Sequence, residues 1–190
     1  LVALFNDFIT VWLGSEYLFS IDIVLVLVIN FYITGMRKAV LTFRDATGLY
    51  WEDRYKPLAE SAINLIFSII LVNFLGTIGV FIGTFISTIT TCFWVEPYVL
   101  YKYEFDLNIK PYLKKYLFYT ILTVTVGIIT ITLCNLINIF GIIGFILKSI
   151  VCVFVVNVIF FIVLHRTEEF KYFKNLIIEF INKKFVKESK

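Results

Sequence analysis

Five long apolar runs constrain the fold of this chain more than any other feature. Each run holds 18 to 23 residues with at most one charge, and the runs cover residues 17–36, 58–75, 77–95, 116–137 and 142–164. A helix needs about 20 mostly apolar residues to cross the roughly 30 Å hydrocarbon core of a bilayer. The alternating pattern of a membrane β-barrel is missing. The sequence therefore predicts an all-α integral membrane protein with about five full transmembrane helices.

Composition supports this class. The chain is 60% hydrophobic and 16% charged, with a mean hydropathy of +0.91. Soluble domains average about 45–50% apolar and about 25% charged residues, so a soluble domain is excluded. The sequence opens on LVALFNDFITVWLG, which is typical of the end of a partial span closing near Gly14. We therefore expect the chain to be the C-terminal part of a longer membrane protein.

The basic residues predict the orientation of the spans. If the spans alternate in direction, residues 37–57, 96–115 and 165–190 lie on one side, and these segments hold 16 of the 17 Lys and Arg residues. The opposite links carry only Glu16 and Asp22. Because cytoplasmic loops carry the excess of Lys and Arg, we expect all three segments and the C-terminus to be cytoplasmic. The net charge of +3 then reflects topology, and we expect no nucleic-acid partner.

The sequence contains no pattern that indicates catalysis or a cofactor. Cys92, Cys134 and Cys152 lie in apolar runs at spacings that match no metal motif, and such cysteines usually pack as small apolar side chains. The one histidine, His165, is expected at the membrane interface. No known catalytic or phosphate-binding motif occurs. The chain is therefore predicted not to be an enzyme and to need no metal or other cofactor.

Two groups of residues stand out within the spans. One is a stripe of small residues spaced four apart, which predicts close packing against the preceding helix at Ser61, Ala62, Asn64 and Ser68; the stripe is Gly79, Gly83, Ser87 and Thr91. The other is a scattered set of polar residues that either pack or serve function: Asp7, Asn64, Asn135, Asn138 and Lys148. For Lys148 the alternatives are snorkelling outward or facing Asn135 or Asn138.

The last segment, residues 165–190, is predicted to be a basic amphipathic helix on the inner leaflet. Its apolar residues share one helical face, and Lys171, Lys174 and Lys183 lie off it; the apolar set is Phe170, Phe173, Ile177, Phe180 and Ile181. The alternative is a simple solvated tail.

Four stretches carry a resemblance to a known family. They are NDFITVWLG, NFYITGMRKAVLTFRDATGLYWEDRYKPL, NLIFSIILVNFLGTIGVFIGTFIS and FWVEPYVLYKYEF. With these stretches the chain resembles the Wzx-type flippases of lipid-linked O-antigen or capsule repeat units, members of the multidrug and oligosaccharidyl-lipid exporter superfamily. The resemblance runs to about residue 105; beyond it only the pattern of two further spans agrees.

The resemblance implies the C-terminal part of a two-lobed, multi-helix exporter in the bacterial cytoplasmic (inner) membrane. Residues 1–95 would be C-lobe helices with the cytoplasmic loop 37–57. Residues 96–115 would be a second loop, 116–164 an additional hairpin, and 165–190 the tail. The implied activity is the transfer of an undecaprenyl-diphosphate-linked oligosaccharide across the membrane by alternating access. The implied partners are that lipid, membrane lipids and other surface-polysaccharide assembly proteins.

The cytoplasmic bases have two interpretations under this resemblance. Either they meet the lipid diphosphate, because arginine forks match phosphate oxygens, or they only set topology; they are Arg37, Lys38, Arg44, Arg54 and Lys56. Two other functions stay open. One is a multidrug or small-solute exporter of the same fold. The other is a membrane-embedded glycan-modifying enzyme, which would need a cluster of His, Arg or Asp at the membrane surface and which the lone interfacial His165 disfavours.

Overall fold

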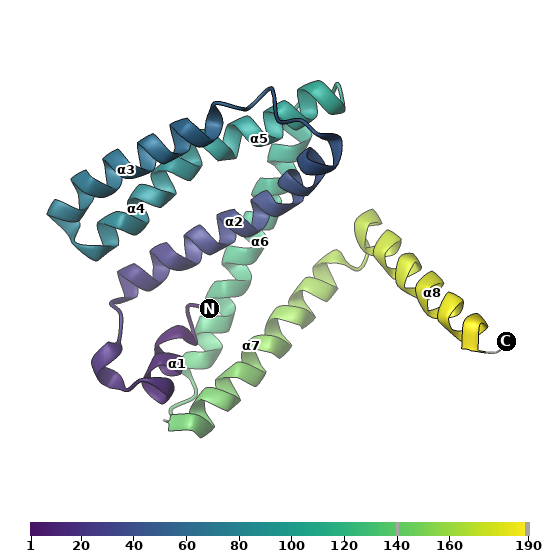
Figure 1. Cartoon of the computed structure of the whole chain (residues 1–190). Helices are drawn as coiled ribbons and strands as arrows, with labels where there is room; N and C mark the ends of the chain where they lie inside the picture. Colours follow the sequence, from purple (N-terminus) through teal and green to yellow (C-terminus); the bar gives the residue numbers. More distant parts are fainter. Residues whose placement is uncertain (140, 189–190) are drawn as a thin grey trace. The chain divides into compact units, whose positions relative to one another are not determined.

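Helices account for all regular structure in the described part of the chain. The computed structural model describes residues 1–139 and 141–188, with side chains for 1–139 and 141–180, and shows no strand among them. This confirms the all-α class. The chain divides into two compact units, Leu1–Thr123 and Val124–Lys190, and each is described by itself (Figure 1).

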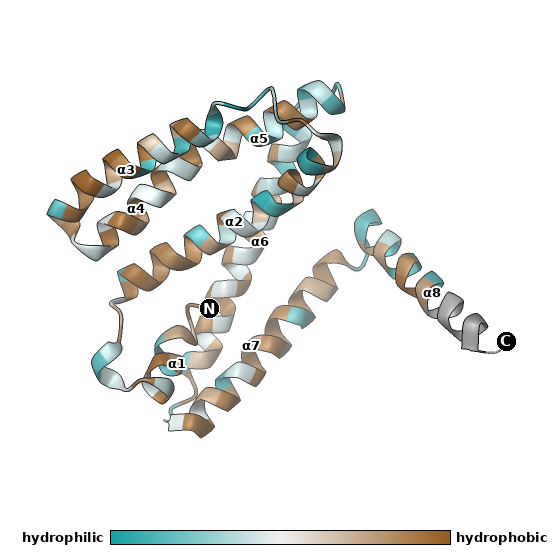
Figure 2. Cartoon of the chain, viewed as in Figure 1, coloured by the Kyte–Doolittle hydropathy of each residue, from teal (hydrophilic) through white to brown (hydrophobic). Residues whose placement is uncertain are grey.

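Five helices are long and apolar enough to cross a membrane, as expected. They are α2 (Ile21–Thr47), α3 (Lys56–Leu75), the continuous helix Thr77–Glu104, α6 (Lys110–Asn135) and α7 (Gly141–Leu164). Apolar residues run along their middles, and polar residues gather towards the ends and the links (Figure 2). Several helices extend beyond the apolar runs because backbone hydrogen bonding continues where the side chains become polar.

The partial first span is a short helix, α1 (Phe5–Trp12), followed by the 3-10 turn η1 (Ser15–Tyr17). Only Ile9 of α1 is buried. The Asn6 side chain ties α1 to the entry of α2 by donating from Nδ2 to the Phe19 carbonyl at 3.1 Å. Asp7 lies in the first turn of α1 and is half-buried.

Helix α3 and helix α4 (Thr77–Ser87) form a tight antiparallel hairpin around Gly76 (Figure 1). Gly76 has φ +63°, a value that glycine adopts without a steric penalty. A Cβ on Gly79 would overlap the Leu71 backbone and lie 2.7 Å from Val72 N, and one on Gly83 would lie 2.8 Å from Ser68 N. The small residues therefore let the two backbones approach closely.

The structure buries every residue of the small-residue stripe, namely Gly79, Gly83, Ser87 and Thr91. The facing residues differ in part from the expected set. Ser68 and Asn64 meet α4, and Asn64 Nδ2 donates to Thr84 Oγ1 at 3.3 Å. Ser61 and Ala62 are exposed. Ala62 lies on a different face of α3 from Asn64 and Ser68, whereas Ser61 shares their face and donates from its hydroxyl to the Pro57 carbonyl at 2.8 Å.

The helix that starts at Thr77 does not end at residue 95. It continues through the π-helical turn η2 (Thr88–Cys92), α5 (Phe93–Val99) and the π-helical turn η3 (Leu100–Glu104). The prediction of a loop over 96–115 was therefore wrong in extent, since only residues 105–109 separate this helix from α6. Pro97 lies inside the helix, and proline and π-turns are the usual sites of local bends.

The link between α2 and α3 covers residues 48–55, which is shorter than the predicted loop 37–57. Gly48 ends α2 in the left-handed conformation with φ +71°, and its N–H donates to the Arg44 carbonyl. This is the usual glycine C-cap. Pro57 lies in the first turn of α3, where a missing N–H costs nothing.

The second unit contains the end of α6, α7 and the tail helix α8 (Glu168–Glu188). The Sγ atoms of Cys134 and Cys152 lie 3.5 Å apart between α6 and α7. Phe170 packs edge-on against Phe161 at 5.7 Å, while Phe173, Ile177 and Phe180 are exposed. The predicted helix is present over the described residues. The Ile181 and Lys183 side chains lie outside the described set.

Candidate functional site

A buried carboxylate, Glu96 on α5, forms the centre of the candidate site. Its side chain is 0% exposed, which is exceptional for a charged group unless it is paired. The guanidinium of Arg37 on α2 donates twice to it, from Nε to Oε2 at 3.0 Å and from Nη2 to Oε1 at 2.6 Å. Such a two-bond pair is among the strongest side-chain interactions in proteins.

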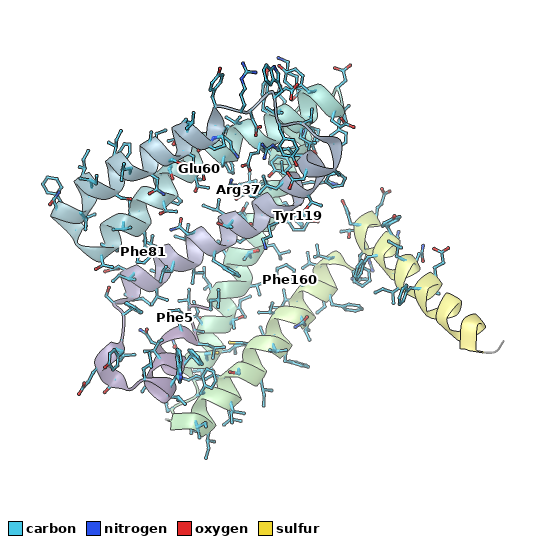
Figure 3. All side chains as sticks on the ribbon, viewed as in Figure 1. Phe5, Arg37, Glu60, Phe81, Tyr119 and Phe160 are labelled. Carbon is cyan, nitrogen blue, oxygen red and sulfur yellow. The ribbon has the colours of Figure 1, made fainter. Side chains whose placement is uncertain are left out.

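Two residues of α3 complete the cluster. The Lys56 ammonium also donates to Glu96 Oε1, and Glu60 Oε1 lies 3.6 Å from Arg37 Nη1. Figure 3 labels Arg37 and Glu60, which lie close together on their two helices. We call Arg37, Lys56, Glu60 and Glu96 the Glu96 network. It joins α2, α3 and α5.

The local sequence explains how these side chains meet. Lys56 and Glu60 are four residues apart on α3 and so share one helical face. Cys92 and Glu96 have the same spacing, and both are fully buried. Glu96 lies between the two π-helical turns and next to Pro97. A π-turn changes the rotation of the following residues about the helix axis, and this irregularity lies beside the network.

The charges of the network balance. Two cations and two carboxylates give a formal sum of zero, with side-chain exposures of 17% for Arg37, 7% for Lys56 and 29% for Glu60. Burying ions is costly, and removing one member of a buried pair usually costs about 3–5 kcal/mol because its partner is left unpaired. Loss of Arg37, Lys56 or Glu96 should therefore weaken the contact among the three helices.

Arg44 forms a second buried pair beside the link. Its Nη2 donates to Asp53 Oδ1 at 2.7 Å, and its Nε donates to the Leu49 carbonyl at 3.2 Å. The Asp53 side chain is 0% exposed. Tyr50 donates from its hydroxyl to Asp45 at 3.2 Å, and loss of solvent and then the Asp45 carboxylate raise the pKa of Tyr50. Arg44 therefore orders the link.

The other predicted phosphate-binding bases have different surroundings. The Arg54 guanidinium lies over the rings of Trp51 and Tyr55, at 3.8 and 4.7 Å from their centroids. Both rings are exposed, and this cation–π arrangement is typical of a membrane interface. Lys38 is exposed and has no ion pair with any described residue. The five bases therefore do not form one cluster.

The structure also places the polar residues predicted within the spans. Asn64 lies in the α3–α4 interface, where Ser68 Oγ donates to its Oδ1 at 3.1 Å. Asn135 and Asn138 are exposed, and Lys148 is half-buried on α7. No hydrogen bond between Lys148 and either asparagine is present among the described residues.

An aromatic group adjoins α2 and the N-terminal half of α6. The Tyr32 and Thr120 hydroxyls lie 2.9 Å apart, and the Tyr116 ring contacts Tyr32 and Phe93 edge-on at 6.4 and 5.0 Å. Edge-on packing suits the ring quadrupoles. These contacts hold α2, α5 and α6 beside the Glu96 network.

Sequence reasoning missed Glu96, which it placed at the start of a loop. A usable signal was present: the apolar run 77–95 continues as EPYVL, so one carboxylate interrupts an otherwise apolar stretch. An ionisable residue in such a position marks a functional candidate. What could not be read was which cations reach it, since Arg37 is 59 residues away in the chain.

Within the described residues, no group of three or more His, Cys, Asp or Glu side chains is arranged to hold a metal ion. Comparison with protein-family models, with characterised proteins and with solved structures finds no match to this chain.

Proposed function

We propose that this chain is part of a flippase that carries a polyprenyl-diphosphate-linked oligosaccharide across the bacterial cytoplasmic membrane by alternating access. The proposal rests on the resemblance of its first 105 residues or so to the Wzx-type exporters. Its expected partners are the lipid-linked glycan, membrane lipids and the proteins that assemble surface polysaccharide. In this proposal the C-terminus is cytoplasmic and no covalent step takes place.

The single observation that supports it best is the Glu96 network. An ion network is buried among α2, α3 and α5. Well-packed apolar residues usually stabilise such a site as well or better, so buried ions are more consistent with a functional role than with stability alone. Paired charges can exist in a closed and an open arrangement. A transporter that alternates between two states needs contacts of this kind between its moving helices.

The network also lies on the side where the basic links gather. Arg37 and Lys56 are among the bases of the segment 37–57, which positive-inside counting assigns to the cytoplasm. A donor lipid made in the cytoplasm enters from that side. Cations at this end of the helices therefore suit an anionic head group better than a neutral one.

The test is a deletion of the gene in the host bacterium, followed by complementation. We expect surface glycan to be lost and the lipid-linked repeat unit to accumulate on the inner leaflet, both restored by the intact gene. Susceptibility to cationic drugs is measured in the same strains. Unchanged surface glycan together with raised drug susceptibility would contradict the flippase proposal and favour a multidrug exporter of the same fold.

A further inference from the structure

Glu96 occupies a site built from two cations. Its carboxylate accepts two hydrogen bonds from the Arg37 fork and one from Lys56. The same donors suit phosphate oxygens, because the guanidinium binds carboxylate and phosphate in the same two-bond geometry. Arg37 and Lys56 thus form a cradle for an anion, and the anion present is part of the chain itself.

We propose that Glu96 is an internal stand-in for the substrate diphosphate, which displaces it from Arg37 and Lys56 during transport. The inference rests on the proposed function for the identity of its ligand. The ligand chemistry is a pair of linked phosphate groups, carried either by a lipid or by free pyrophosphate. Displacement would release α5 from α2 and α3.

Charge conservation supports an exchange of anions. If Glu96 left alone, Arg37 and Lys56 would remain as buried cations without their main counter-ion, which is strongly unfavourable. A diphosphate brings at least two negative charges and several acceptor oxygens. It can therefore replace the carboxylate on both cations, whereas a neutral solute cannot.

The exposure of the network provides a direction of entry. Glu96 is fully buried and Lys56 nearly so, but Arg37 is 17% and Glu60 29% exposed. Glu60 lies 3.6 Å from Arg37 Nη1, so an incoming anion first meets a cation that is only weakly paired on that side. Neutralising Glu60 should therefore ease entry, though less than neutralising Glu96.

The helix that carries Glu96 is suited to the movement. Glu96 lies between η2 and η3 and beside Pro97, and irregular turns of this kind let a helix segment rotate or shift. Because a ligand shifts a conformational equilibrium only through its different affinity for the two states, competition between diphosphate and Glu96 couples binding to helix movement.

Binding is tested with the purified full chain in lipid nanodiscs and inorganic pyrophosphate, by calorimetry and by phosphorus NMR. We expect Glu96→Gln to bind pyrophosphate at least tenfold more tightly than the wild type. The gain should vanish in Glu96→Gln with Arg37→Gln. Equal affinity of Glu96→Gln and wild type, or a gain that survives without Arg37, would overturn the proposal.

Glu60→Gln provides a second variant in case Glu96→Gln folds poorly, and Glu52→Gln is the matched control, because it removes one negative charge from an exposed side chain of the α2–α3 link. We expect a smaller gain in affinity for Glu60→Gln than for Glu96→Gln, and none for Glu52→Gln. Equal gains in Glu60→Gln and Glu52→Gln would mean a general charge effect and would contradict specific binding at Arg37 and Lys56. Farnesyl diphosphate placed in the nanodisc then distinguishes a lipid-borne ligand from a free one, since a lipid site binds it more tightly than pyrophosphate.

Displacement itself is measured through Cys92, which is fully buried one turn before Glu96. In a background with Cys134→Ser and Cys152→Ser, pyrophosphate should speed maleimide labelling of Cys92 several-fold. Binding without faster labelling would mean that Glu96 stays in place, and the proposal would fail.

These binding and labelling measurements involve no transport, so they test the site separately from the proposed function. If pyrophosphate displaces Glu96 but deletion of the gene leaves surface glycan unchanged, the proposed function is refuted and the anion-exchange site still stands.

Discussion

The Arg37 guanidinium on α2 holds the Glu96 carboxylate on α5 by two hydrogen bonds, at 3.0 and 2.6 Å, across 59 residues of chain. Lys56 reaches the same carboxylate from α3. This arrangement joins three helices through one fully buried acid. It also accounts for two of the basic residues that sequence alone assigned to a loop surface, because their charges are satisfied inside the protein.

A double-mutant cycle on Arg37 and Glu96 should show strong coupling. We expect Arg37→Gln and Glu96→Gln each to lower the free energy of unfolding by about 3–5 kcal/mol, because each leaves a buried partner unpaired. The double variant should cost clearly less than the sum of the two. Denaturation of the protein in detergent measures this. Additive losses would mean that the pair is not coupled.

The Arg37→Lys variant should restore only part of the loss. A lysine keeps the charge but cannot form the two-bond fork, so its stability should lie between that of Arg37→Gln and the wild type. Stability equal to the wild type would mean that charge alone matters at this position.

Close packing of the α3–α4 hairpin predicts that Gly83→Leu lowers folded yield. A side chain there would strike the Ser68 backbone, since even a Cβ lies 2.8 Å from Ser68 N, and overpacking typically costs about 1–3 kcal/mol or more. The matched control is Gly35→Ala on α2, where nothing lies within 4 Å of an added Cβ. That variant should gain about 0.5–1 kcal/mol from helix propensity. Equal yields for the two variants would contradict the packing.

The two arginines of the α2–α3 link should differ in their effect on stability. Arg44→Ala leaves Asp53 buried without its cation and frees the Leu49 carbonyl, so we expect a loss of about 3 kcal/mol or more. Arg54→Ala removes contacts with exposed rings, for which about 0.5–1 kcal/mol is typical, and one exposed hydrogen bond to the Trp51 carbonyl. Thermal unfolding of both variants compares them. A larger loss in Arg54→Ala would be inconsistent with the buried pair.

Contact between α6 and α7 can be tested by oxidation. Cys134 and Cys152 have their Sγ atoms 3.5 Å apart, so copper phenanthroline with dissolved oxygen should join them within one chain. Peptide mass spectrometry detects the product. Cys92, which is fully buried in the other unit, provides the control and should stay reduced. Pairing of Cys92 with either of the others would contradict the burial of Cys92 within its own unit.

The sequence by itself was sufficient for the number of spans. That number and the small-residue spacing of Gly79 and Gly83 are local properties, set by hydrophobicity over about 20 residues and by the helical repeat. The stripe could be recognised because residues four apart share a helical face whatever the surroundings. The end of the helix at Glu104 was not predicted, since polar side chains near an interface do not stop backbone hydrogen bonding.

Only the tertiary structure decided the partners of the charged residues. Arg37, Lys56, Arg44 and Arg54 look alike as members of one basic segment, yet the first two meet Glu96, the third meets Asp53 and the last lies over exposed rings. Which carboxylate a base reaches depends on how α2, α3 and α5 pack, and helix packing is set by contacts between residues far apart in the chain. Hydrophobicity and charge counts contain no information about those contacts.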